Sequence, residues 1–448
     1  MTKTKVVILG GGPSGLGVAW GLKDFGDCQV RLVEKADRLG GLSGSFEWES
    51  SVLDFGPHRF SPEFPEFIDY FKERMGEDLL KIKNEHAVVF RGRTYRYPPQ
   101  VKDFLNLDSV KFSFQVLGSM IREVLSPSLV QDSFQSRVIR SFGSTLFHEV
   151  VSPLSHKVWG DPVDFHPDFA GIRFSVPTVK QWAKKWLKLA KANQDEFFYY
   201  PKNGFSQLWD VLAADLRDGG VEISTKSEVS EIQVERDKVV AVKINNQWES
   251  CDYLVSTIPL EKLLLLMEQR ETYFETRGML LIHFLIAKGK VLPARVVIFP
   301  ESDYVFNRLC EPSQFSLRGA DSGKTILQAD VTKDVAGRSD AQWIELVKEQ
   351  LVSLKLINPN EILKAEVLRL QAAYPIPSKI REHSQAQWQQ DSPWQNVFST
   401  GRFASSDYNN SHTALFKGRE LARFILGGQS PTRWYQHAES LRKIPVRD

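Results

Sequence analysis

Residues 5–34 read KVVILGGGPSGLGVAWGLKDFGDCQVRLVE, and they carry the strongest indication of the fold class. The apolar run 5–9 is typical of a buried parallel strand. Residues 10–15 match the motif G-x-G-x-x-G, and apolar residues at helical spacing follow them. A second apolar run, 29–34, ends in an acid. Strand, glycine loop, helix and strand in this order predict a βαβ unit that binds a dinucleotide.

Each part of this unit has a physical role in holding a dinucleotide. Gly10 permits the tight turn, Gly12 lets the backbone approach the pyrophosphate, and Gly15 allows close contact between helix and strand. The N-terminus of the helix offers free N–H groups and a partial positive charge to the phosphates. Glu34 follows Gly15 by 19 residues, where a carboxylate can accept hydrogen bonds from a ribose hydroxyl.

The identity of the dinucleotide is indicated by the residues that follow. Glu34, Arg38, Gly40 and Gly41 resemble E-x-x-x-R-x-G-G, the second signature of the FAD-binding amine-oxidase and glutathione-reductase-like superfamily. This resemblance implies FAD as the cofactor and a cofactor domain to which later segments of the chain return. The residues predicted to contact FAD are Gly10, Gly12, Pro13, Ser14, Gly15, Glu34, Lys35, Arg38, Gly40, Gly41, Leu42, His58, Val229, Gly401, Arg402 and Asn410.

Further motifs along the chain narrow the resemblance to the UDP-galactopyranose mutase-like branch of the amine oxidase and protoporphyrinogen oxidase superfamily. One is D-x-G-x-H-x-F, which places His58 beside the flavin, and another is K-x-W with an arginine fourteen residues after the tryptophan. The segments that carry this resemblance are 54–60, 97–98, 157–160, 200–205, 374–375, 401–403 and 408–418, together with Arg173 and Arg308.

The resemblance implies a second site, for a substrate, whose chemistry suits a diphosphate. Arg173 and Arg308 are far apart in sequence, but planar guanidinium groups bind such a group well if they converge on it. Most arginines are surface residues, and Tyr374, Tyr408 and Trp159 could equally be ordinary buried aromatics. The predicted catalytic residues are His58, Arg173, Arg308, Tyr374 and Tyr408, and the predicted substrate-binding residues are Tyr97, Trp159, Arg173, Arg308, Tyr374 and Tyr408.

Two functions from different reaction classes fit these motifs. The first is a mutase acting on a nucleoside-diphosphate sugar, in which the resemblance implies pyranose/furanose isomerisation through a reduced-flavin N5 adduct and an external reductant such as NAD(P)H or a reductase. The second is an FAD-dependent oxidoreductase of the amine oxidase or desaturase type, transferring a hydride from an amine, sugar or isoprenoid. The twin arginines favour the first, whereas departures from the mutase pattern at Pro99, Ser155 and Ser411 favour the second. A flavin-bearing sensor without turnover is a third hypothesis.

The sequence therefore predicts an α/β protein: a discontinuous Rossmann-like, glutathione-reductase-like FAD-binding domain with an inserted α+β substrate domain. We assign 1–60, 196–265 and 385–448 to the FAD-binding domain. The substrate-binding domain is assigned 61–195 and 266–384. It contains an amphipathic, core-facing helix within 101–130 (Phe104, Leu107, Val110, Phe114, Leu117 and Met120), an antiparallel sheet within 272–336 and a helix at 340–356.

Composition excludes several other classes of protein. The 448 residues carry a net charge of +2, which gives no case for nucleic acid. Three scattered cysteines have no metal-like spacing and are typical of reduced thiols. No apolar run approaches the roughly 18 residues of a membrane helix. We therefore expect a soluble, cytoplasmic protein with a small-molecule substrate, no metal, no integral membrane segment and possible homo-oligomers.

Overall fold

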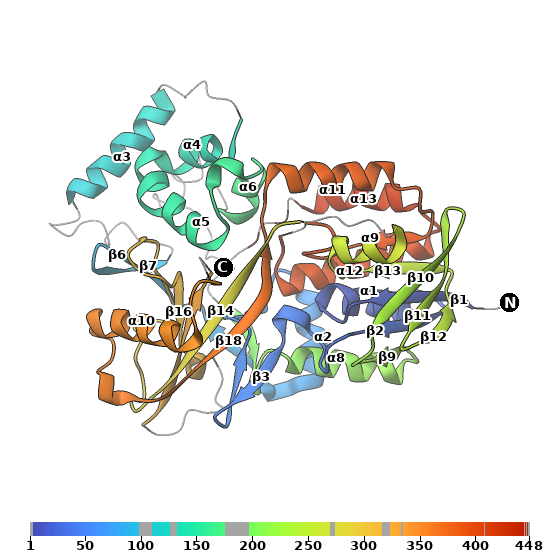
Figure 1. Ribbon diagram of the computed structural model, residues 1–448, viewed down its shortest axis with the longest axis horizontal. Helices are drawn as coiled ribbons and strands as arrows, with labels where there is room; N and C mark the ends of the chain where they lie inside the picture. The colour runs from blue at the N-terminus through green and yellow to red at the C-terminus, as the bar shows by residue number, and fades with distance from the viewer. Residues whose placement is uncertain are drawn as a thin grey trace.

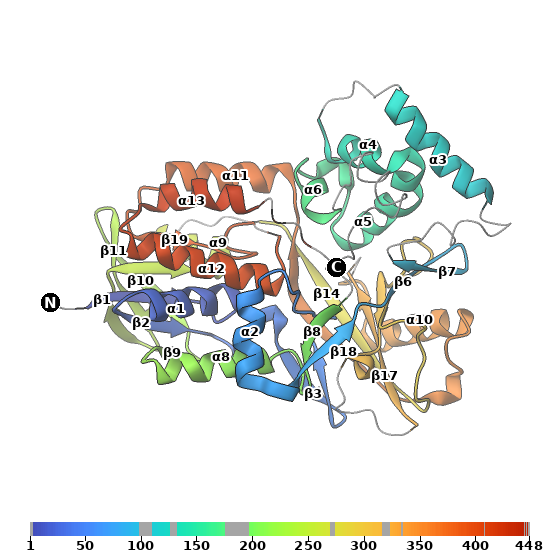
Figure 2. The same cartoon turned by 180° about the vertical axis from the view of Figure 1, so that it is seen from behind.

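A computed structural model describes residues 3–97, 110–125, 132–174, 197–268, 274–315, 323–332, 335–406, 408–442, 444 and 446. Two parts lie side by side (Figures 1 and 2): a part built on a parallel sheet, which contains the N-terminus, and a part built on a larger, mostly antiparallel sheet. A lobe of helices lies above the second sheet in Figure 1. The predicted fold class is confirmed.

The parallel sheet assembles from five segments spread along the chain. Its order is β19-β13-β1-β2-β9, and every pair of neighbours is parallel. Residues 5–9 and 29–33 lie in its centre, as the apolar runs predict. The strands are β1 (Thr4–Leu9), β2 (Cys28–Val33), β9 (Glu222–Ser224), β13 (Tyr253–Ser256) and β19 (Val397–Ser399).

Helix α1 (Pro13–Phe25) follows the glycine loop and packs closely on α12 (Ser411–Leu426). A Cβ atom added at Gly17 would lie 2.3 Å from the backbone oxygen of Leu415. No side chain larger than hydrogen fits there, and the glycine thus lets α12 approach α1 closely. Among the described residues, this part also contains α2 (Pro65–Met75), α8 (Gln207–Asp218), α9 (Leu260–Glu268) and α13 (Pro431–Leu441), and α11 (Lys379–Asp391) packs on α13 through Trp388.

Residues 229–250, within the predicted FAD-binding domain, form strands of a separate sheet. β10 (Val229–Glu235), β11 (Lys238–Ile244) and β12 (Gln247–Ser250) are antiparallel neighbours. Two smaller pairs are β3 (Ser45–Trp48) with β4 (Ser51–Asp54) and β5 (Leu79–Lys83) with β8 (Phe197–Pro201). Phe67, Phe71 and Leu79 share one core with the parallel sheet, although we assigned residues 61–195 to the substrate-binding domain.

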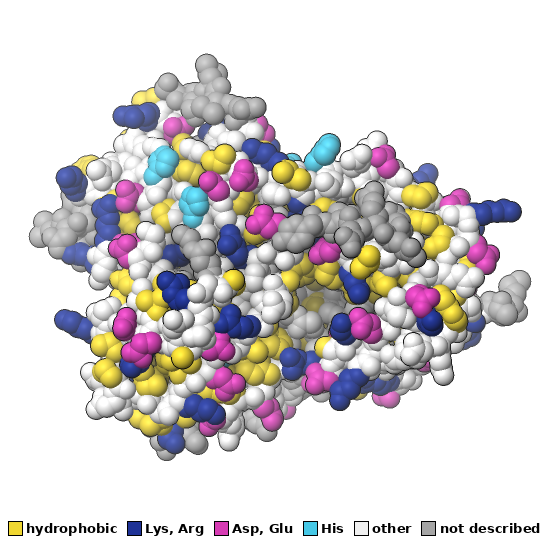
Figure 3. All heavy atoms as spheres, viewed as in Figure 1, with side chains coloured by type: hydrophobic (Ala, Val, Ile, Leu, Met, Phe, Trp, Pro, Cys, Tyr) yellow, Lys and Arg dark blue, Asp and Glu magenta, His cyan; other side chains and the backbone are white. Residues whose placement is uncertain are grey.

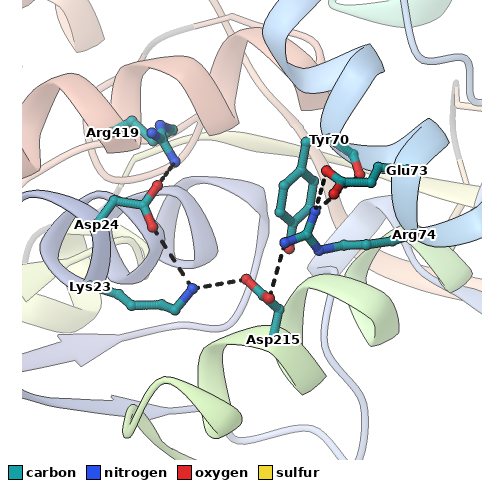
Figure 4. Close-up of polar contacts among 7 residues, drawn as sticks. All are labelled: Lys23, Asp24, Tyr70, Glu73, Arg74, Asp215 and Arg419. Atoms are coloured by element: carbon teal, nitrogen blue, oxygen red, sulfur yellow. Dashed lines mark hydrogen bonds and ion pairs between the residues drawn. The ribbon is translucent and has the colours of Figure 1, made fainter.

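A cluster of ion pairs, which we call the helix clamp, joins four helices of this part (Figure 4). Asp215 on α8 accepts from Lys23 on α1 at 2.9 Å and from Arg74 on α2 at 3.2 Å. Asp24 on α1 lies 2.9 Å from Arg419 on α12 and 3.8 Å from Lys23. In the helix clamp each cation therefore has a carboxylate neighbour, and cations and acids alternate around it.

The second sheet has seven strands in the order β18-β14-β17-β16-β15-β6-β7. Neighbours are antiparallel except β15 and β6, which are parallel, so the antiparallel sheet predicted within 272–336 is largely confirmed. Helix α10 (Asp340–Ser353) covers one face of this sheet and corresponds to the helix predicted at 340–356. The strands are β6 (His86–Phe90), β7 (Arg93–Tyr97), β14 (Thr276–Ile286), β15 (Val296–Ile298), β16 (Arg308–Cys310), β17 (Thr325–Val331) and β18 (Ile362–Pro375).

The helical lobe contains α3 (Val110–Leu125), α4 (Phe134–Leu146), α5 (Ser152–Val158) and α6 (Phe169–Arg173), and α11 (Lys379–Asp391) follows the second sheet. The core-facing prediction for α3 is wrong for Phe114 and Leu117, which are 69% and 42% exposed. These two residues lie on the side of the helix away from Phe112, which is buried. Of the remaining predicted segment, 101–109 and 126–130 lie outside the described residues. Among the helices that the structure describes, none is long and apolar enough to cross a bilayer.

Candidate active site

A cavity of about 400 Å³ lies where the two sheets and the helical lobe meet. Its walls come from distant parts of the chain: the glycine loop, the segment 55–59, helices α5 and α6, strands of the second sheet, and the segment 401–411. Most of the predicted site residues line this cavity. They are Gly10, Gly12, Pro13, Ser14, Glu34, Gly41, Leu42, His58, Trp159, Arg173, Arg308, Tyr374, Gly401, Arg402, Tyr408 and Asn410.

The glycine loop has the geometry that a pyrophosphate needs. Gly10 has a φ of +101°, which favours glycine, and a Cβ at Gly15 would lie 2.0 Å from the backbone oxygen of Gly10. Gly12 has open space where a Cβ would be, and it begins α1 without a side-chain cap. The first N–H groups of α1 therefore face the cavity without competition from a capping side chain.

Glu34 is held by the backbone at the end of β2. One carboxylate oxygen accepts from the N–H of Gly11 and the other from the N–H of Ala36, both at 2.7 Å. These bonds fix the carboxylate at the cavity wall, where its remaining lone pairs can accept from a ribose hydroxyl. The glycine loop and Glu34 thus fit the nucleotide half of a dinucleotide.

Five predicted cofactor residues do not line the cavity. Gly15 is covered by the glycine turn, and a Cβ at Gly40 (φ +96°) would lie 2.3 Å from the Trp209 ring. Lys35 is exposed and pairs with Glu228 at 2.9 Å, and the Arg38 guanidinium lies 4.7 Å from the centre of the Phe55 ring. Val229 is buried at the start of β10. These five residues lie in or around the glycine loop and the segment 34–41, or at the start of β10, outside the cavity lining.

The segment 401–410 closes the cavity from the C-terminal side. Gly401 has a φ of +103°, and a Cβ there would lie 2.8 Å from the Ser14 hydroxyl. Arg402 donates to the backbone oxygen of Asn409 at 2.6 Å, and its guanidinium lies 5.2 Å from the centre of the Tyr408 ring. Asn410 precedes α12, so a second helix begins at this wall.

His58 lies in the cavity wall, stacked on Phe205 at 5.1 Å between ring centres. Burial, and then the charges of Arg402 and Arg308, lower the pKa of His58 to about 3. The imidazole is therefore neutral at physiological pH. Its Nδ1 atom lies 3.9 Å from Oδ2 of Asp54.

Asp54 is a buried residue that accepts several hydrogen bonds, and sequence reasoning did not single it out. It accepts from the Ser45 hydroxyl at 2.6 Å, the Tyr200 hydroxyl at 2.7 Å and the N–H of Phe205 at 3.1 Å. Burial raises the pKa of Asp54 to about 6, although these hydrogen bonds oppose the shift. Asp54 belongs to the motif that carries His58, so its position in that motif was the available signal.

The predicted substrate residues converge around one aromatic cluster. Tyr374 and Tyr408 are stacked, with ring centres 6.2 Å apart and planes 19° from parallel. Trp159 lies edge-on to both, at 6.4 Å and 6.0 Å. The Arg173 guanidinium lies 5.5 Å from the centre of the Trp159 ring. Trp159 is also 2% exposed and packs in the core of the helical lobe, so it both lines the cavity and belongs to a core.

Arg308 enters the cavity from β16 with a fixed orientation. Its Nε atom donates to Oδ2 of Asp330 at 2.7 Å, and a second guanidinium nitrogen, Nη2, pairs with the same oxygen. Asp330 is fully buried and also accepts from Gln328 at 2.9 Å. Sequence reasoning missed Asp330, whose signal was a single acid within the apolar strand β17. It also missed Arg59, which lines the cavity beside His58.

Tyr97 does not line the cavity. It is 45% exposed at the last residue of the edge strand β7, next to Arg96, which is exposed as well. Across the hairpin it pairs with His86, which does line the cavity. Of the departures from the mutase pattern, Ser411 lines the cavity and Ser155 is buried in α5 outside it, while Pro99 lies outside the described residues.

Part of the cavity wall is apolar. This part combines residues of the second sheet with two phenylalanines and a helix of the lobe. Its members are Leu154, Val158, Phe198, Met279, Val296, Ile298, Phe315, Leu370 and Ala373. The cavity therefore offers a polar, arginine-bearing wall and an apolar one to whatever enters it.

Comparisons with known proteins agree with this arrangement. A family model for flavin containing amine oxidoreductases matches residues 13–433. The curated 4,4'-diaponeurosporene oxygenase of Staphylococcus aureus (strain bovine RF122 / ET3-1) is 21% identical over 292 residues. That match covers 59% of this chain and 58% of the relative, so the chain spans little more than half the length of this curated relative.

Two solved structures share the fold over nearly the whole chain. Reduced UDP-galactopyranose mutase has a TM-score of 0.78 at 21% identity and covers 97% of this chain and 98% of its own. Wild-type putrescine oxidase bound to putrescine has a TM-score of 0.60 at 14% identity and covers 95% and 99%. At these identities the likeness concerns the fold and leaves the reaction open.

Proposed function

The chain belongs to the flavin containing amine oxidoreductase family. Within this family, we propose that it isomerises a nucleoside-diphosphate sugar. The family confirms FAD as the cofactor and makes the protein a flavin-dependent enzyme. The proposed reaction interconverts the pyranose and furanose forms of the sugar. An external reductant, NAD(P)H or a reductase, keeps the flavin reduced.

The observation that carries this proposal is the convergence of arginines on the cavity. Arg59, Arg173, Arg308 and Arg402 all line it, and Glu34 is the sole acid among the described residues that do so. Glu34 lies at the glycine loop, in the half that fits the cofactor. An excess of guanidinium groups in a partly apolar cavity suits a substrate with several negative charges, such as a diphosphate.

The chain's own residues have distinct parts in this reaction. Reduced FAD, when bound, supplies the nucleophile for sugar transfer. Arg173 and Arg308 bind the diphosphate and keep it in the cavity after the sugar leaves it. Tyr374 and Tyr408 donate their hydroxyl groups to phosphate oxygens, and the Trp159 ring offers an apolar edge to the sugar. Neutral His58 can accept a hydrogen bond from the substrate without adding charge.

A second candidate is an FAD-dependent oxidoreductase, and the apolar wall favours it. Residues such as Met279, Phe315 and Leu370 suit a hydrocarbon chain, and Asp330 neutralises the charge of Arg308. Among similar proteins, one is named as an oxygenase of diaponeurosporene and another is an oxidase of putrescine. In this reaction oxidised FAD accepts a hydride from the substrate.

One anaerobic experiment separates the two candidates. The purified protein is reduced and incubated with UDP-, dTDP- and GDP-sugars, and the products are followed by chromatography. A new isomer formed only with reduced flavin, and formed about 100-fold more slowly in Arg173→Ala, supports the mutase. Arg433→Ala serves as the matched control, because Arg433 is exposed on α13 and does not line the cavity.

The opposite outcome is equally clear. If no sugar nucleotide is isomerised, and an amine, sugar or isoprenoid bleaches the oxidised flavin, the mutase proposal is wrong and the oxidoreductase replaces it. The flavin absorbance of each variant before reduction checks that the cofactor is still bound.

A further inference from the structure

One face of α3 carries a row of exposed apolar side chains, which we call the α3 stripe. It consists of Phe114, Leu117, Ile121 and Leu125, which are 69%, 42%, 48% and 79% exposed. Single exposed apolar residues are normal, but a contiguous row of large ones marks an interaction surface.

The stripe points away from the protein. Its spacing of three, four and four residues places all four side chains within an arc of about 80° at roughly 100° per residue. Phe112 lies nearly opposite, is 7% exposed and contacts Phe90 with 5.3 Å between ring centres. On that side also, Ser119 and Met120 lie against Gly143 of α4. Helix α3 is therefore anchored to the lobe by one face and presents its most apolar face to solvent.

Positive charge borders the stripe. Lys111 and Arg122 are exposed and lie on one flank of it, about 60° to 80° from Phe114 around the helix axis. The one acid of α3, Glu123, lies on the opposite side of the helix and is partly buried. Arg96 is exposed on the neighbouring β6–β7 hairpin. In Figure 3 dark blue side chains lie at the left beside α3 and this hairpin, with magenta side chains among them.

An apolar stripe with cations on its flank is the pattern of a helix that lies in the interface of a membrane. The helix has 16 residues, so it is about 24 Å long and can lie flat in the headgroup region without spanning the bilayer. Its cations complement anionic lipid headgroups. A second copy of this chain fits less well, because pairing two stripes would bring Lys111 and Arg122 of one copy close to the same cations of the other.

We propose that the α3 stripe docks the protein on the surface of an anionic phospholipid bilayer. Phe114, Leu117, Ile121 and Leu125 enter the boundary between headgroups and acyl chains, and Lys111 and Arg122 lie among the phosphates. The helical lobe, which contains Trp159 and Arg173, is thereby held near the membrane, whichever reaction takes place in the cavity.

Vesicle flotation of the flavin-loaded protein tests this proposal. We expect binding to vesicles of phosphatidylcholine with 30% phosphatidylglycerol (about one anionic lipid in three) and binding at least about 10-fold weaker to phosphatidylcholine alone. The variant Leu117→Gln/Ile121→Gln should weaken binding to the anionic vesicles by about 10-fold or more. Lys111→Gln/Arg122→Gln should weaken it by several-fold and reduce its dependence on salt.

The matched control is Leu363→Gln/Ile380→Gln, which removes two apolar residues that are 50% and 80% exposed elsewhere on the molecule. It should bind vesicles like the parent protein. Flavin absorbance and melting temperature should be unchanged in all three variants, because the replaced side chains are exposed. Absence of binding to either kind of vesicle, or undiminished binding of the stripe variant, would overturn the proposal. A parent dimer that the stripe variant converts to a monomer would assign the stripe to a second copy instead.

Discussion

The helix clamp and the cavity both contain arginines, but they differ in how many acidic residues lie beside those arginines. In the helix clamp, Lys23, Arg74 and Arg419 alternate with Asp24 and Asp215 at 2.9 to 3.8 Å (Figure 4). In the cavity, four arginines share the described lining with the single acid Glu34. The carboxylates of the helix clamp match its cations, whereas the arginine-rich lining of the cavity suits a ligand that carries negative charge. We therefore interpret the helix clamp as structural and the cavity as the binding site proposed above.

Arg308 lines the cavity and also pairs with the buried Asp330, so replacing it should have the largest effect. Arg308→Ala leaves Asp330 buried without its cation, so we expect a loss of about 3 to 5 kcal/mol in the free energy of unfolding as well as a loss of activity. Chemical unfolding measures the first effect and turnover the second.

A double variant distinguishes these two roles of Arg308. Arg308→Met/Asp330→Leu replaces the pair by apolar side chains and should recover most of the stability. Its activity should stay about 100-fold below that of the parent. Full recovery of activity in the double variant would contradict a role for Arg308 in binding the substrate.

Asp54 is a buried acid near the cavity that is held by hydrogen bonds from neutral groups. Because its pKa is raised to about 6 in the folded protein, its contribution to stability is complete below its unfolded pKa of about 4 and is lost as the pH rises through 6. We expect the free energy of unfolding of the parent, relative to Asp54→Asn, to fall by about 3 kcal/mol between pH 4 and pH 7. Urea unfolding at several pH values gives both curves, and parallel curves would show that Asp54 does not titrate in this range.

Arg173 should affect function alone. It lies at the surface of the cavity above the Trp159 ring, so Arg173→Ala should lower kcat/KM by about 100-fold and change the melting temperature little. Steady-state kinetics and thermal unfolding of the same preparation test both halves of this prediction. A large fall in melting temperature would instead show that Arg173 stabilises the fold, as the residues of the helix clamp do.

Asp215 should show the reverse behaviour and the smallest effect. Asp215→Asn weakens the pairs with Lys23 and Arg74, which are partly exposed, so we expect a loss of about 1 kcal/mol in stability and unchanged kcat/KM. High salt should narrow the stability difference between variant and parent, because it screens these pairs. A changed kcat/KM would contradict the purely structural role.

The sequence predicted best what depends on local pattern. Residues 5–34 form the βαβ unit, and the motifs at His58, Trp159, Arg173, Arg308 and Tyr408 meet in one cavity. What depends on tertiary packing was less accessible. Periodicity finds the apolar face of α3 but does not reveal whether that face meets the core or solvent, and here Phe114 faces solvent.

Partners within the core were also hidden from sequence reasoning. Asp330 pairs with Arg308 only because β16 and β17 are neighbours, and the residues lie 22 positions apart. Tyr97 was predicted to bind the substrate, yet it lies at the exposed end of the edge strand β7 and does not line the cavity. Motifs single out candidate residues, whereas the tertiary fold decides which of them reach the cavity.

The position of β19 in the parallel sheet has a consequence for how the chain is made. Its partner β13 ends at Ser256, and β19 begins only at Val397, followed by the helix α12 that packs on α1. Nearly the whole polypeptide must therefore be synthesised before the parallel sheet and the contact between α1 and α12 can form. Contacts so distant in sequence form slowly, because the intervening chain must first be brought together. During synthesis the side of α1 that faces α12 in the folded protein thus stays uncovered until α12 has been made.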